Sequence, residues 1–156
     1  MEAARSATAA DLPRLAELWR DARAELGPMR GGQLLLAHGG RVEPVEKSLL
    51  ADLDDPERGL WVGTIDETVI GYAAGRVEDL DDRTRLGVIT ELFVEPDARA
   101  VGVGEAMMAT MLVWFADRRC EGVDAVALPG HRATKNFFED FGFTARLLVM
   151  HHRLDG

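Results

Sequence analysis

The segment ELFVEPDARAVGVG, residues 91–104, places the strongest constraint on how this chain can fold. An apolar run ends at Pro96, and two glycines, Gly102 and Gly104, stand directly before a stretch with helical spacing. The first turn of a helix carries unpaired N–H groups and the positive end of the helix dipole. Glycine also lets a backbone approach a ligand closely. The segment therefore predicts a strand, a turn and a helix whose N-terminus binds an anion, with Arg99 adding positive charge.

Hydrophobic periodicity and turn residues predict the other elements along the chain. We expect a strand at 3–8, helices at 11–26 and 46–53, strands at 60–65, 68–77 and 86–94, a helix at 102–119, a strand at 124–128, a helix at 132–140 and a final strand at 145–154. The glycine-rich residues 28–44 are expected to form a variable loop. This order predicts an α/β (α+β) fold with a mixed, mostly antiparallel central sheet and helices on both faces.

Length and charge narrow the class of protein. The 156 residues favour a single domain over residues 1–156. A net charge of −9 without a lysine or arginine run argues against nucleic acid as a partner and leaves room for an amine-bearing one.

Cysteine content and hydropathy suggest a location. Cys120 is the only cysteine, so the chain can form neither an intrachain disulfide nor a thiolate zinc cluster, and we expect no metal. No apolar run reaches the length of about 18 residues that a membrane span requires, and the N-terminal residues lack the apolar region of a secretory signal. We therefore expect a cytoplasmic protein that does not bind membranes.

Two nucleotide-binding motifs do not fit the glycine-rich turn. A dinucleotide fingerprint requires a third glycine where Met107 stands, and the glycine-lysine-serine/threonine of a Walker loop is absent. The pattern Arg99-x-x-Gly102-x-Gly104 after an apolar strand instead resembles motif A of the GNAT acyltransferase superfamily. A second segment, NFFEDFGF at 136–143, resembles the aromatic signature of that family, which ends in Gly-Phe.

The resemblance implies an acetyl-CoA-dependent N-acetyltransferase that acts on a primary amine of a small molecule or peptide. It implies that pantetheine runs along Leu92, Phe93 and Val94 and that a backbone N–H near Val94 polarises the acyl carbonyl. The residues that it implies around the diphosphate are Arg99, Ala100, Val101, Gly102, Val103, Gly104 and Glu105, with Asn136 as a further cofactor contact. Many members of the family pair through the sheet edge, which implies a possible homodimer.

Three side chains are candidates for the chemistry of amine acetylation. Glu91 precedes the pantetheine segment and is the first candidate for the base that removes the amine proton; alternatively it is a solvated carboxylate at a strand end. Tyr72 either packs within its strand or lines the acceptor cleft. His131 either donates a proton or contacts the cofactor, or is a surface residue at a helix start. The family's usual tyrosine is replaced by Phe138, which has no proton to give the leaving thiolate.

Two other functions remain open on the sequence. The replacement at Phe138 is compatible with a non-catalytic GNAT-fold module that binds acyl-CoA as a sensor or structural subunit. A phosphate-binding protein unrelated to acyl transfer is the third reading of the glycine-rich turn.

Overall fold

The structure is a computed structural model that describes residues 1–154. Its elements are β1 (Glu2–Ser6), η1 (Ala9–Asp11), α1 (Leu12–Leu26), α2 (Gly32–Ala37), α3 (Val45–Leu53), β2 (Arg58–Ile65), β3 (Thr68–Asp79), β4 (Arg85–Val94), η2 (Pro96–Ala98), α4 (Val103–Asp117), β5 (Gly122–Ala125) and α5 (Arg132–Asp140). None of the helices in this part of the chain combines the length and hydropathy needed to cross a membrane.

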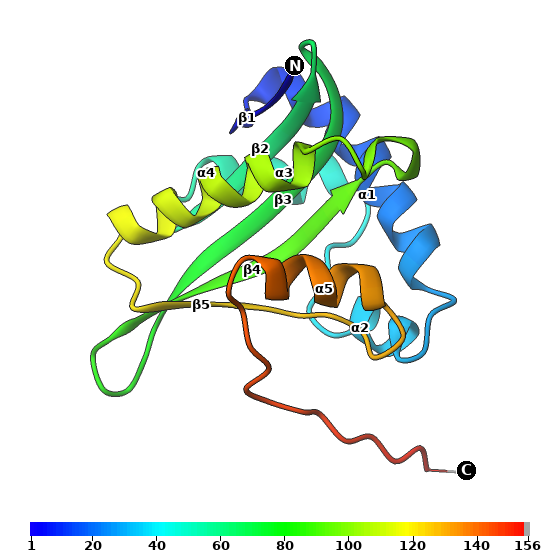
Figure 1. Cartoon of the computed structure of the whole chain (residues 1–156), viewed down its shortest axis with the longest axis vertical. Coiled ribbons are helices and arrows are strands. Elements are labelled where there is room, and N and C mark those ends of the chain that lie inside the picture. The colour runs from blue at the N-terminus through cyan, green and yellow to red at the C-terminus, as the bar shows by residue number, and fades with distance from the viewer. Residues whose placement is uncertain (155–156) are drawn as a thin grey trace.

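The strands form one five-stranded sheet in the order β1-β2-β3-β4-β5 (Figure 1). The first four strands pair antiparallel, and β5 pairs parallel to β4 after the crossover through α4. The β2–β3 connection turns at Asp66 and Glu67, which both have positive φ as a tight hairpin requires. The predicted mixed, mostly antiparallel sheet is thus confirmed.

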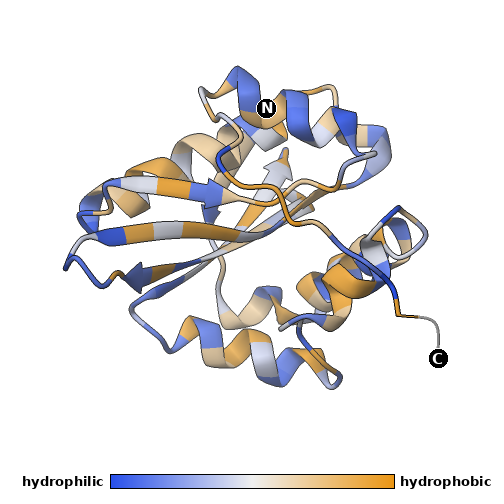
Figure 2. Cartoon of the chain, turned by 90° about the horizontal axis from the view of Figure 1, so that it is seen from below, coloured by the Kyte–Doolittle hydropathy of each residue, from blue (hydrophilic) through white to orange (hydrophobic). Residues whose placement is uncertain are grey.

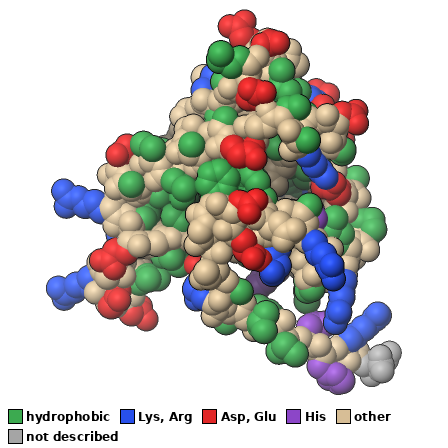
Figure 3. All heavy atoms as spheres, in the orientation of Figure 1, with side chains coloured by type: hydrophobic (Ala, Val, Ile, Leu, Met, Phe, Trp, Pro, Cys, Tyr) green, Lys and Arg blue, Asp and Glu red, His purple; other side chains and the backbone are tan. Residues whose placement is uncertain are grey.

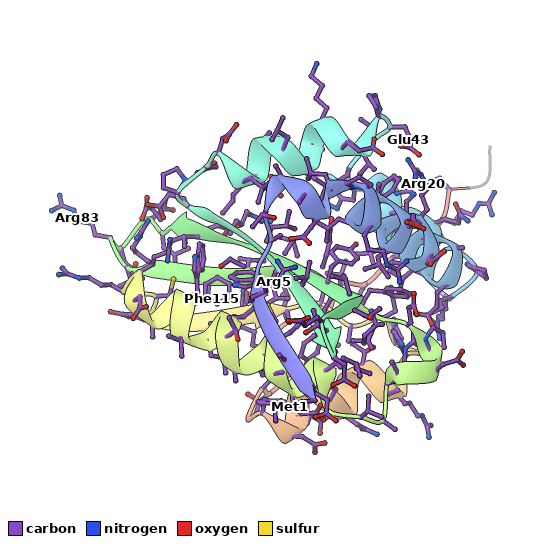
Figure 4. The ribbon with its side chains drawn as sticks, turned by 90° about the horizontal axis from the view of Figure 1, so that it is seen from above. Met1, Arg5, Arg20, Glu43, Arg83 and Phe115 are labelled. Atoms are coloured by element: carbon purple, nitrogen blue, oxygen red, sulfur yellow. The ribbon has the colours of Figure 1, made fainter. Side chains whose placement is uncertain are left out.

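Helices cover both faces of the sheet, as predicted (Figure 2). On one face α1 and α3 pack through a cluster that includes Leu15, Leu18 and Leu49, all fully buried. On the other face α4 packs through Met107, Met111 and Phe115. Figure 4 places Phe115 between α4 and the sheet.

Glycines in the strands let α4 lie close to the sheet. A Cβ added at Gly63 would lie 2.4 Å from Val103 Cγ1, and one added at Gly87 would lie 2.5 Å from Phe115 Cδ1. Real Cβ atoms do not approach other atoms so closely, so side chains there would push the helix away. The small residues of the strands therefore fix the position of α4, whose first turn carries the predicted anion site.

Two expectations from the sequence are wrong. The expected loop at 28–44 contains the short helix α2, and the expected strand at 145–154 does not form. Residues Leu147–Met150 are four consecutive apolar residues without alternation, so no face of a strand is specified. The available edge of β5 is only four residues long, and the segment is tied to it mainly by Arg146, which binds Asp124. The segment instead leads away from the fold with its side chains exposed (Figure 3).

Candidate active site

A bulge in β4 marks the centre of the site. Ala74 of β3 pairs with Glu91, and the next residue of β3, Gly75, pairs with Ile89, so Thr90 is the extra residue. Pairing between β4 and β5 also stops at Ile89, which lies opposite Ala125. Beyond this point β4 has a strand partner only on its β3 side. The two neighbouring strands therefore separate where the sequence predicted that pantetheine would run.

A cavity of about 730 Å³ lies at this separation. It is bounded by α1 and α2, by β4, and by the segment that connects β5 to α5. Its lining includes Trp19, Arg23, Leu26, Leu35, Leu36, His38, Arg41, Ser48, Asp52, Arg58, Tyr72, Arg76, Glu91, Leu92, Phe93, Leu128, His131, Thr134 and Phe138. The three residues predicted to be catalytic, Glu91, Tyr72 and His131, are thus brought together in one cavity.

The Glu91 carboxylate lies within β4 and is mostly removed from water, which argues against the alternative of a solvated carboxylate at a strand end. Its side chain is 20% exposed, and Oε1 accepts a hydrogen bond of 2.8 Å from Arg41 Nε. Its other oxygen, Oε2, is buried and accepts no well-aligned hydrogen bond from the described residues, although the neighbouring Tyr72 hydroxyl helps to lower the pKa of this carboxyl group. Burial raises the pKa of Glu91, although the Arg41 guanidinium opposes this shift. A buried carboxylate with a raised pKa and a free oxygen has the properties of a general base.

Arg41 connects Glu91 to α3. Its Nη2 donates to Asp52 Oδ2 at 2.6 Å and its Nη1 to Ser48 Oγ at 3.0 Å. The Arg41 side chain is 9% exposed and that of Asp52 is 10% exposed. Four residues, one from the loop before α3, two from α3 and one from β4, thus form one buried network that fixes the position of the Glu91 carboxylate.

Tyr72 is a core residue that also lines the cavity. It pairs with Phe93 across β3 and β4 and is 1% exposed. Burial, together with the negative charge of Glu91, raises the pKa of Tyr72 well above its usual value. The hydroxyl therefore stays protonated at neutral pH.

His131 lies at the start of α5 and lines the cavity. The Thr134 hydroxyl is 2.9 Å from the imidazole, and Thr134 is one helical turn before Phe138. Phe138 is 6% exposed and lines the same cavity. His131 thus lies on the face of α5 that carries the residue in the family's tyrosine position.

The first turn of α4 has the form of an anion site. Gly102 precedes the helix with φ 91°, a conformation that L side chains rarely adopt, and no side chain caps the helix. The N–H groups of Val103, Gly104 and Glu105 therefore lack intrahelical partners. A Cβ at Gly104 would lie 3.1 Å from Phe137 Cε1, so glycine also keeps α5 close to this turn.

The remaining cofactor candidates occupy different places. Arg99 donates from Nε to the Val94 carbonyl at 2.8 Å and forms an ion pair of 2.7 Å with Glu25, so its charge is already paired. Ala100 and Val101 are exposed in the turn before Gly102. Leu92 and Phe93 line the cavity, Val94 is buried, and Asn136 is exposed on α5 outside the cavity lining. No cluster of three or more His, Cys, Asp or Glu side chains suited to a metal occurs within residues 1–154.

Three residues of the site could not be predicted from local sequence patterns. Arg41 and Asp52 lie 50 and 39 positions from Glu91 in segments without strong periodicity, and only the tertiary structure joins them. Arg23 follows Trp19 by four positions on α1, a spacing that places the two side chains on one helix face.

Comparison with known proteins agrees with this geometry. The family model described as "Acetyltransferase (GNAT) family" matches residues 15–143. The chain belongs to the GNAT family. The matched range includes the segment from Arg99 to Gly104, in which the sequence resembles motif A.

Solved structures share the GNAT fold at low sequence identity. An aminoglycoside acetyltransferase from an uncultured soil metagenomic sample, in complex with sisomicin, is 17% identical with a TM-score of 0.73, over 99% of this chain and 95% of that one. AAC(6')-Iy, in complex with a bisubstrate analogue of CoA and acetylneamine, is 18% identical with a TM-score of 0.74, over 100% and 99%. A predicted acetyltransferase from Clostridium acetobutylicum with acetyl-CoA is 17% identical with a TM-score of 0.72, over 98% and 96%. No curated protein matches the chain in sequence.

Proposed function

We propose that the chain is an acetyl-CoA-dependent N-acetyltransferase that transfers acetyl to a primary amine by direct attack, with Glu91 as the base. The observation that carries this proposal is the buried Oε2 of Glu91, a residue of the cavity lining, which accepts no well-aligned hydrogen bond within residues 1–154. A buried polar atom without a partner costs free energy, and an incoming ammonium group would satisfy it.

Two backbone features, the first turn of α4 and the free edge of β4, fit acetyl-CoA. The uncapped first turn of α4 offers N–H groups to the diphosphate, and the free edge of β4 after Ile89 offers backbone groups to pantetheine. Bound acetyl-CoA supplies the activated acetyl thioester. A backbone N–H near Val94 is proposed to polarise the thioester carbonyl.

Proton transfer follows from the positions of the side chains. A primary alkylamine has a pKa of about 10.4 and must lose a proton before it attacks. Glu91 accepts that proton, the neutral amine nitrogen bonds to the acetyl carbon, and the carbon–sulfur bond breaks with its electron pair on the thiolate sulfur. The surplus proton on the new amide nitrogen passes to solvent. His131 gives a proton to the departing thiolate, which is already a fair leaving group because a thiol pKa is about 8.5.

The second candidate function is a non-catalytic module that binds acyl-CoA. Phe138 favours it, because a phenyl ring in the cavity cannot serve as an acid. The single cysteine supports a cytoplasmic, reducing location for either function.

Two measurements test the proposal. Thermal denaturation with acetyl-CoA, NAD and ATP should show stabilisation by acetyl-CoA alone. Release of free thiol from acetyl-CoA should then be measured over a panel of primary amines, with longer acyl-CoAs as further donors. Turnover with an amine supports the transferase, whereas tight binding of acetyl-CoA without turnover on any amine would favour the non-catalytic module.

A further inference from the structure

The charges that line the cavity are opposite in sign to the charge of the whole chain. The lining contains four arginines but only two carboxylates, whereas the chain as a whole carries −9. The two carboxylates are Glu91 and Asp52, and both are bound by Arg41. The cavity therefore offers one free carboxylate oxygen to an acceptor and no acidic wall for further cationic groups.

Most of the arginines in the lining are neutralised by neighbouring acids. Arg41 binds both carboxylates of the lining, Arg58 is 3.6 Å from Asp55, and Arg76 is 2.5 Å from Glu78. These side chains complete structural ion pairs, so they have little capacity for a ligand.

Arg23 differs from them. No carboxylate of the described residues lies within ion-pair distance of it, and its guanidinium carbon lies 4.9 Å above the Trp19 ring. The Arg23 charge helps to lower the pKa of Glu43, but the Glu43 carboxylate already accepts hydrogen bonds of 2.9 and 3.1 Å from Arg20 (Figure 4). Stacking on an aromatic ring orients a guanidinium and leaves its N–H fork free for an anion.

We propose that the acceptor is an amine that also carries an anionic group, either a carboxylate or a phosphate ester, and that Arg23 binds this group. This inference rests on the proposed acetyl transfer. The amine then lies at Glu91 and the anion at Arg23. Leu35 and Leu36 of α2 give the cavity an apolar wall for the part that joins the two ends. A polyamine such as an aminoglycoside lacks the anion and carries surplus positive charge toward the arginines.

Matched acceptors test this inference. The first series consists of ω-amino acids from glycine to 6-aminohexanoate beside their carboxamides, which differ in charge but hardly in shape. The second pair is O-phosphoethanolamine and ethanolamine, which separates phosphate from carboxylate recognition, and sisomicin serves as the polyamine. We expect kcat/KM for an anionic acceptor to exceed that of its neutral partner by about 10- to 100-fold, since hydrogen bonds between charged groups are of that strength.

Variants assign the preference to Arg23. Arg23→Gln should remove most of the preference, measured as the ratio of kcat/KM for the anionic acceptor to kcat/KM for its neutral partner, and Arg23→Lys should keep part of this ratio. Arg30→Gln removes the same charge from an exposed position outside the cavity lining and should change neither value. Thermal denaturation of each variant identifies any loss of fold. If Arg23→Gln does not fold, the preference for anionic acceptors is compared between Arg23→Lys and the unmodified protein.

The outcomes separate the two proposals. Equal turnover of acids and amides would overturn the assignment of Arg23, and so would a preference that persists in Arg23→Gln. Neither result would contradict the proposed acetyl transfer. Efficient turnover of sisomicin would overturn the assignment of Arg23 as well. If acetyl-CoA binds but no amine of any class is acetylated, the proposed function fails and the inference fails with it.

Discussion

Arg41 Nε lies 2.8 Å from Glu91 Oε1, and through this contact the segment before α3 holds the carboxylate of β4 at the edge of the cavity. The same guanidinium binds Asp52, so one buried cation serves two buried anions. Because Glu91 Oε2 is left free, the network orients the carboxylate without consuming its second oxygen. The base is therefore positioned by a residue that lies 50 positions away in the chain.

Substitution of Arg41 should shift the pH dependence of acetyl transfer. The Arg41 charge lowers the pKa of Glu91, against the larger effect of burial. Arg41→Gln should therefore raise that pKa further. Because the proposed reaction requires ionised Glu91, the variant should lose activity at a higher pH than the unmodified protein does during acidification. The variant should also lose about 3 kcal/mol of unfolding free energy, because two buried carboxylates lose their cation. The measurements are kcat/KM against pH and chemical denaturation.

Asp52→Asn provides a control with the opposite sign. The Asp52 charge raises the pKa of Glu91, so its removal should move the acid limb of activity to lower pH. Shifts of the two variants in the same direction would show that the limb reports something other than the ionisation of Glu91.

Glu91→Gln tests the base itself. The amide keeps the shape of the side chain but cannot accept the amine proton, so kcat should fall by about 100-fold or more. Stabilisation by acetyl-CoA should persist, because Glu91 is not part of the α4 turn. Glu95→Gln, one residue beyond the end of β4 and bound to Arg14, is the control and should retain activity. Full activity of Glu91→Gln would show that Glu91 is not the base.

The sequence predicted those parts of the fold that depend on local patterns. Helical spacing and the glycine turn before α4 are encoded by neighbouring residues, and both appear in the structure. The four apolar residues of Leu147–Met150 suggested a strand, but strand formation depends on an available edge, and β5 is short. Arg41 and Arg23 gain their roles only from tertiary packing around the cavity, which no local spacing reports.

Gly102→Glu tests the anion site. It adds bulk and negative charge where φ is 91°, and we expect it to abolish the thermal shift that acetyl-CoA produces. Gly102→Ala has the same backbone strain without the charge, so it should retain part of the shift. Gly122→Glu adds the same charge at an exposed glycine with open space around its Cα and should bind acetyl-CoA normally. Normal binding by Gly102→Glu would show that the diphosphate lies elsewhere.

Asp11 should contribute to stability above acidic pH. Arg5 donates to its two oxygens at 2.8 and 3.0 Å and the Thr8 N–H donates at 2.8 Å, which together lower the pKa of Asp11 below its usual 3.8. A lowered pKa gives stability that is present above the unfolded value and is lost as pH falls through the folded value. Asp11→Asn should therefore cost about 1 kcal/mol at neutral pH and almost nothing in strong acid. Denaturation at both pH values, with exposed Asp81→Asn as control, measures the difference; a loss independent of pH would assign it to packing.

His131 and Phe138 together test how the thiolate leaves. If His131 donates the proton, His131→Gln should lower kcat by about tenfold or more without weakening the binding of acetyl-CoA. Phe138→Tyr places a phenol in the same cavity, at the position where the family carries tyrosine, one helical turn beyond Thr134. In the His131→Gln background this second change should restore much of the lost kcat, because either side chain then supplies the proton. If His131→Gln keeps full activity and Phe138→Tyr changes nothing, the thiolate departs without an acid, as its pKa of about 8.5 permits.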